Sequence, residues 1–287
     1  MSNYQMVGDS FRLGYRFQRH WDTAMAGAFF CGELGAGLFF VSLILENPIG
    51  MAFGLLIAGI IKPIFHLTHM GVPGKSWRAI LRPDRSWISR GLIAIIVFTA
   101  AGTGHVINLI WHDVIPFGTI FEILAGAAAL VVMAYHGLSM SHSTAIALWS
   151  TALMPVLSLL YALTGGLAII VLLSSASTLS GGAPPLLSLL QGLLIADLVM
   201  ISSFIYSANN GSAGAKLSAQ LLIKTRYAYW FVGGVVVLGL VLPLFSLSLW
   251  PTIEAMQIIS VASMLTGFYI FRIVVFKAGV YEPVLPI

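Results

Sequence analysis

Long apolar runs recur along the whole chain, and they limit its possible folds more than any other feature. There are eight of them, at residues 22–45, 48–68, 88–111, 117–138, 144–173, 184–207, 227–248 and 252–276. As a helix rising about 1.5 Å per residue, each run can cross roughly 30 Å of hydrocarbon. None alternates apolar and polar residues as the strands of a transmembrane β-barrel do. The runs predict an all-α polytopic membrane protein, with a bundle of eight transmembrane helices.

The composition supports the same class. Hydrophobic residues make up 59% of the 287 residues and charged residues only 8%, whereas a soluble domain carries roughly 25% charged residues. Short turn-type stretches such as "ENPIG" separate the runs, so we expect one membrane domain over residues 1–287. Residues 1–21 are polar and lack the apolar core of a signal peptide, and we expect them to form a cytoplasmic tail. The single cysteine, Cys31, excludes an iron–sulfur cluster held by this chain alone.

The fourteen Lys and Arg residues all fall on one side of the expected bundle. With eight spans, both termini and the connections after the second, fourth and sixth spans share that side. The positive-inside rule then predicts an inner (cytoplasmic) membrane protein with both termini in the cytoplasm. Residues 69–87 form the most basic connection, a cytoplasmic loop between the second and third helices. Because topology accounts for the cations, the net charge of +4 does not indicate a nucleic-acid partner.

A few ionisable residues fall at membrane depth, where charges are costly and often functional. Glu33 lies in the first run within "FFCGELGAGLFF", whose small residues suit close helix packing and direct the carboxyl into the bundle. Asp197 lies near the centre of the sixth run, and His105 lies on the third. Each of these three is either a buried packing residue or a group that handles protons.

Histidines at the end of the second run suggest a binding site at the membrane edge. Lys62, His66 and His69 are spaced to share one helix face, next to the basic loop. A quinone headgroup needs a donor for each carbonyl oxygen and an apolar slot, and histidine can donate a hydrogen bond and relay a proton. We therefore predict a quinone site with His69 as its main contact. The lesser candidates are His66, Trp77, Trp87 and Arg90.

Two alternatives stay open. A b-type haem needs two histidines facing each other across helices, and His66 or His69 with His136 or His142 could supply them. A proton-coupled transporter could instead use Glu33 and Asp197 within the membrane. No other metal site is predicted.

Two motifs resemble those of a known family. "HMGVP" at residues 69–73 is similar to the H-L-G-x-P pattern that ends the second helix of the DmsC/NrfD-like (PsrC-like) anchor subunits of molybdenum or tungsten iron–sulfur oxidoreductases. An Arg-Ala pair (residues 78–79) and a Ser-x-x-Ser segment, "SWIS", follow as in that family. "GELGAG" in the first run resembles the family's small-residue motif. Eight spans over this length match the DmsC branch throughout.

The resemblance implies a function. Such anchors exchange electrons between the quinone or menaquinone pool and a ferredoxin-like iron–sulfur subunit, beyond which lies a molybdopterin catalytic subunit. They typically hold no haem, so clusters and molybdopterin would belong to the partner subunits alone. His69 occupies the position of the family's quinone-associated histidine, whereas Arg90 and Gly91 stand where some members carry an acidic residue. The residues expected to dock the partner through charge complementarity are Lys75, Arg78, Arg82 and Arg85.

Overall fold

A computed structural model of the chain describes residues 14–111, 118–176 and 183–282. Six spans are continuous helices: α1 (Thr23–Ile44), α4 (Trp87–Ile110), α5 (Gly118–Ser141), α6 (Leu153–Ala176), α7 (Ala183–Asn209) and α10 (Glu254–Lys277). The second span consists of α2 (Pro48–Leu56), η2 (Ile57–Ile61) and α3 (Lys62–His69), and the seventh of η4 (Tyr229–Val241) and α9 (Leu242–Leu249). Within these described residues, eight helices are long and apolar enough to cross a membrane. The predicted multi-pass α-helical bundle is confirmed.

Both composite spans contain a π-helical segment that ends just before a proline. The segment η2 precedes Lys62 and Pro63, and η4 precedes Leu242 and Pro243. A proline ring clashes with the carbonyl four residues earlier and lacks the N–H that would bond to it. The wider π-helical turn accommodates the ring without ending the span. Lys62, the first residue after this turn in the second span, is buried in the bundle.

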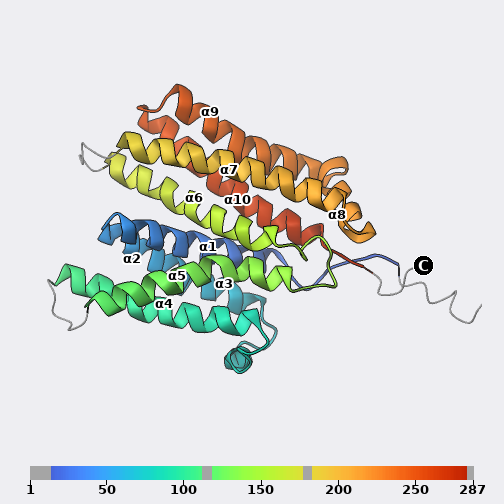
Figure 1. Ribbon diagram of the computed structural model, residues 1–287, viewed down its shortest axis with the longest axis horizontal. Coiled ribbons are helices and arrows are strands. Elements are labelled where there is room, and N and C mark those ends of the chain that lie inside the picture. Colours follow the sequence, from blue (N-terminus) through green and yellow to red (C-terminus); the bar gives the residue numbers. More distant parts are fainter. Residues whose placement is uncertain (1–13, 112–117, 177–182, 283–287) are drawn as a thin grey trace, which may run out of the picture.

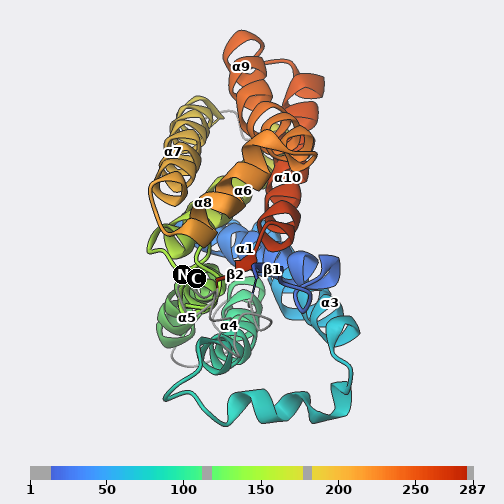
Figure 2. The same cartoon turned by 90° about the vertical axis from the view of Figure 1, so that its right-hand side faces the viewer.

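Connections at one end of the bundle carry most of the exposed cations, and we call it the basic end. Strand β1 (Arg16–Phe17) pairs there with β2 (Val280–Tyr281) in an antiparallel ladder, so the two ends of the described chain meet. The 3-10 helix η3 (Pro73–Ile80) lies in the loop before α4, and α8 (Ala213–Lys224) follows α7. This end is on the right in Figure 1 and faces the viewer in Figure 2.

Helix α1 lies between two groups of helices. Figures 1 and 2 show α2 to α5 on one side of it and α6 to α10 on the other. Glycines allow the close approach: a Cβ on Gly35 would lie 2.7 Å from the Gly54 carbonyl oxygen of α2, and one on Gly37 would overlap the Ala162 carbonyl of α6. The small-residue face predicted around Glu33 is therefore a packing surface for two different helices.

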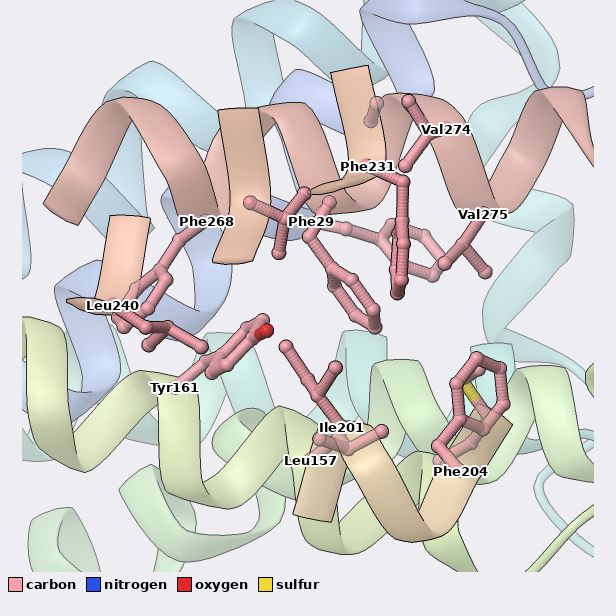
Figure 3. Packing of buried hydrophobic residues seen from close by; sticks show 14 of the residues in the cluster. Phe29, Leu157, Tyr161, Ile201, Phe204, Phe231, Leu240, Phe268, Val274 and Val275 are labelled. Atoms are coloured by element: carbon pink, nitrogen blue, oxygen red, sulfur yellow. The ribbon is translucent and has the colours of Figure 1, made fainter. Parts of the chain in front are cut away.

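The buried apolar side chains form two clusters that follow this division. The larger one joins the first half of α1 to α6, α7 and α10, and Figure 3 shows part of it, with Tyr161 among Leu157, Ile201 and Phe268. The smaller one joins α1, α2, α4 and α5 around Phe39. Helix α1 contributes side chains to both clusters.

Two details differ from the sequence-based expectation. The fifth span begins at Leu153 rather than at residue 144, because residues 144–152 form turns and Ile146 bridges to Tyr281. Pro155 lies in the first turn of α6, where its missing N–H leaves no intrahelical bond unmade. The connection after α7 also contains the helix α8, which its turn-type residues did not indicate.

Candidate functional site

A cavity of about 370 Å³ opens at the basic end between α1, α3, α4, α5 and η3. Its walls are mainly aliphatic and aromatic. They include Phe29, Trp77, Ile95 and Tyr135. A volume of this order, with a few polar groups on an apolar wall, is typical of a small-molecule site. Trp77 belongs to this wall, although 59% of its surface remains exposed.

Lys62 and His66 supply the basic groups of the cavity wall, which also includes Ser76 and Ser139. Lys62 is only 4% exposed. No ion pair of Lys62 occurs among the described residues, and its amine lies 5.3 Å from the centre of the Tyr135 ring. The Nδ1 atom of His66 is buried without a hydrogen-bond partner in the same part of the chain. A buried ammonium group without a carboxylate is costly, so this wall is suited to a ligand that offers acceptor atoms.

His69 has a different environment. It does not line the cavity, and its Nδ1 lies 3.0 Å from Asp22 Oδ1. The same Asp22 oxygen caps α1 by accepting from the Met25 amide. Partial burial raises the pKa of Asp22, but the hydrogen bonds from Met25 and His69 outweigh it and hold the pKa below its usual value. His69 therefore ties the end of α3 to the start of α1.

The far end of the basic loop is held by its own hydrogen bonds. Arg90 donates to the carbonyl oxygens of Pro83 and Asp84 at 2.7 and 3.0 Å, and its guanidinium lies 4.5 Å from the Trp87 ring centre. Trp87 in turn donates to His142 Nε2 at 3.1 Å. Neither Arg90 nor Trp87 reaches the cavity. The "SWIS" segment has a structural role as well, because Ser86 caps α4 and Ser89 donates to the Ala79 carbonyl.

The predicted docking residues lie on the surface of this loop. Lys75 and Arg78 are exposed on η3, and Arg82 and Arg85 are exposed in the turn that follows. Arg85 pairs with its neighbour Asp84 at 3.1 Å, with both side chains exposed. The result is a row of exposed cations directly beside the cavity.

A second group of polar side chains lies deeper and is almost completely buried. Glu33 of α1 accepts from Arg272 of α10 at 2.9 Å and contacts it again at 2.7 Å. Arg272 also donates to Ser158 of α6 at 2.8 Å and contacts the Met140 sulfur of α5 at 3.9 Å. His136 of α5 lies 3.7 Å from Glu33. We call Glu33, His136, Ser158 and Arg272 the buried ion cluster, and it joins α1, α5, α6 and α10.

The buried ion cluster adjoins the cavity wall. A Cβ placed on Gly32 of α1 would overlap His136 and lie 3.4 Å from Lys62 Cγ, so both side chains pack over this glycine. The rings of His136 and Tyr135 lie 3.9 Å apart. Neither nitrogen of His136 has a hydrogen-bond partner in the described part of the chain. His136 therefore lies between the wall of the cavity and the carboxylate of Glu33.

The other two candidates for proton handling, Asp197 and His105, are not members of the buried ion cluster. Asp197 of α7 is fully buried and accepts from Thr164 of α6 at 2.7 Å. His105 is buried on α4 near its opposite end, away from the basic end. Glu33 and Asp197 thus both face the interior, an orientation that the sequence predicted for Glu33.

Sequence reasoning missed Lys62 and Arg272 as interior residues, because it counted both among the cations of the basic side. Their position inside apolar runs, in "IAGIIKPIF" and "FYIFRIVVF", could have indicated that they are buried.

No protein-family model matches the chain, and no curated protein matches it in sequence. Chemically, the cavity offers an apolar slot with an ammonium group and an imidazole on one wall. That combination suits a flat, largely apolar molecule with acceptor oxygens at its edge.

Proposed function

We propose that the chain is a membrane anchor subunit that exchanges electrons between the quinone pool and an iron–sulfur partner subunit. The observation that carries the proposal is the apolar cavity at the basic end, with buried Lys62 and half-buried His66 on its wall. The resemblance of "HMGVP" and "GELGAG" to the DmsC/NrfD-like anchors supports it. A quinone, menaquinone included, would supply two-electron, two-proton redox chemistry when bound.

The residues of the cavity fit such a headgroup. The Lys62 ammonium group can donate to one carbonyl oxygen, and the imidazole of His66 can donate to another and relay a proton. Phe29, Trp77 and Ile95 provide the apolar slot that excludes water from the ring. His69 becomes a positioning residue in this proposal, because it fixes the end of α3 through Asp22.

The partner would dock on the exposed cations next to the cavity. Lys75, Arg78, Arg82 and Arg85 form a positively charged surface that suits an acidic ferredoxin-like subunit. The iron–sulfur clusters and the molybdopterin would belong to that subunit and to a catalytic subunit beyond it. If the basic end faces the cytoplasm of a cell with the protein in its inner membrane, the substrate is a cytoplasmic one, oxidised to feed the quinone pool. A C-terminal reporter that is active only in the periplasm should then give no signal.

A binding measurement on the purified full-length protein tests the quinone site. A soluble quinone analogue should quench the fluorescence of Trp77 and other tryptophans at the cavity. Lys62→Met should lower the affinity for the analogue by about ten- to a hundredfold, since a hydrogen bond to a charged group contributes about 1.5–3 kcal/mol. Lys75→Met removes an exposed lysine of the same kind and should leave the affinity unchanged. Equal affinity in wild type and Lys62→Met would contradict the site.

Purification in mild detergent tests the partners. Iron–sulfur and molybdopterin subunits should co-purify with the chain, and reversing the four docking charges should release them. His66→Ala should abolish quinone-linked turnover while leaving the turnover of the catalytic subunit with soluble dyes intact. A chain that purifies alone and transports a solute would support the transporter alternative, and a reduced haem spectrum would support the haem alternative.

A further inference from the structure

Buried polar atoms continue from the ion cluster into the second half of the bundle. Tyr161 of α6 is 3% exposed, and its hydroxyl has no hydrogen-bond partner among the described residues. Asp197 is fully buried, and in the same part of the chain its Oδ1 has no partner, while Oδ2 accepts from Thr164. Buried polar atoms without partners are rare in native proteins, so two of them in one region require an explanation.

A small cavity connects the ion cluster to Tyr161. It has a volume of about 10 Å³ and is lined by Glu33, Tyr161 and three apolar side chains, Phe30, Leu34 and Phe268. A volume of roughly 10–15 Å³ is enough for one water molecule, provided that polar groups are present to bind it. The Glu33 carboxylate and the Tyr161 hydroxyl are such groups. In Figure 3 the Tyr161 hydroxyl is the one oxygen among the labelled apolar side chains.

Asp197 is hydrogen-bonded to the face of α6 that carries Tyr161. Tyr161 and Thr164 are three residues apart on α6 and so share a face, and Thr164 donates to Asp197. A carboxyl group that is held in an apolar interior by one hydroxyl donor is least costly when it carries a proton.

We propose that these groups form a proton path from the cavity to the middle of the membrane. The path runs from His136 to Glu33, through one water to Tyr161, and ends at Asp197, which stores the proton. Each transfer moves a proton and no electron. Asp197 protonates the Tyr161 oxygen, the Tyr161 proton passes to the water, and a proton of that water passes to Glu33. Glu33 then gives a proton to His136 Nδ1, and His136 releases the proton of its other ring nitrogen to the cavity side. The role of the path rests on the proposed function, in which reduction of the quinone consumes two electrons from the partner's clusters and two protons.

Infrared spectroscopy of the full-length protein in lipid tests the path without any turnover. The C=O stretch of a protonated Asp197 should appear as a band that is absent from Asp197→Asn. On transfer to deuterated water, this band should shift as deuterium replaces the proton. Tyr161→Phe should slow the shift by roughly tenfold or more, because exchange must then wait for local opening of the bundle.

Tyr269→Phe provides the matched control, since Tyr269 is a partly buried tyrosine of α10 that faces a different, apolar pocket. It should leave the exchange rate unchanged. If Tyr161→Phe does not fold, the same measurement on Glu33→Gln, which interrupts the path at its other end, should show the same slowing. The proposal is overturned if Asp197→Asn removes no carboxyl band, or if the band exchanges as fast in the path variant as in the wild type.

The outcome is separate from that of the quinone site. Binding of the quinone analogue depends on Lys62 and His66, whereas the exchange measurement follows Asp197. If Tyr161→Phe slows the exchange of the Asp197 band but the analogue does not bind, the quinone proposal is refuted and the path stands. If the analogue binds but the exchange is not slowed, only the path is refuted.

Discussion

Replacing Arg272 by methionine should destabilise the protein by about 3–5 kcal/mol, because it leaves the Glu33 carboxylate buried without its counter-charge. Arg272 is 1% exposed and makes three short contacts, two to Glu33 and one to Ser158. Hydrogen bonds between membrane helices contribute about 0.6 kcal/mol each on average. Three of them would therefore account for only about 2 kcal/mol. The larger expected loss comes from the isolated charge.

The double variant Glu33→Gln/Arg272→Met separates the two contributions. It removes both charges, so it should recover most of the loss and lie within about 2 kcal/mol of the wild type. Reversible unfolding in mixed micelles, followed by circular dichroism, measures each free energy. Lys277→Met removes an exposed cation from the last turn of the same helix and should cost less than about 0.5 kcal/mol. An Arg272→Met loss below about 1 kcal/mol, or a double-variant loss equal to the sum of the single losses, would refute the reasoning.

Three further outcomes are expected. Gly37→Leu should destabilise the bundle and lower its unfolding midpoint, because even a Cβ at this position overlaps the backbone of α6. Gly233→Leu should leave the midpoint unchanged, because Gly233 has open space around it. Gly32→Ala should displace His136 and weaken quinone-analogue binding through the cavity wall, measured by tryptophan fluorescence. The contact of Asp22 with His69 should stabilise the protein fully at a pH above the usual carboxyl pKa. This stabilisation should be lost as the pH falls through the lowered pKa of Asp22. Asp22→Asn keeps the cap and should abolish this acid dependence, which thermal unfolding across pH would detect.

Several parts of the architecture were predictable from the chain alone. The eight apolar runs predicted eight membrane-spanning helices, because hydrocarbon requires every backbone group to bond within its own helix. The small residues around Glu33 predicted a tightly packed first helix, and "ENPIG" marked the turn after it, where Asn47 caps α2 and Glu46 adopts a φ of 51°. These features are local, so the sequence determines them without knowledge of neighbours.

The arrangement of the polar residues was decided by tertiary structure. By spacing, Lys62, His66 and His69 share a face of α3, but only Lys62 and His66 line the cavity. His69, the last residue of the helix, contacts Asp22 at the start of α1 instead. Glu33 and Arg272 form a buried charged pair although they are 239 positions apart in the chain. Hydrophobic periodicity shows that a residue lies in the membrane, whereas its partner depends on which helices pack together. The sequence therefore determined the number of membrane spans and the membrane class. Only the packing of α1 against α3, α4 and α5 created the cavity, and only its packing against α5, α6 and α10 created the buried ion cluster.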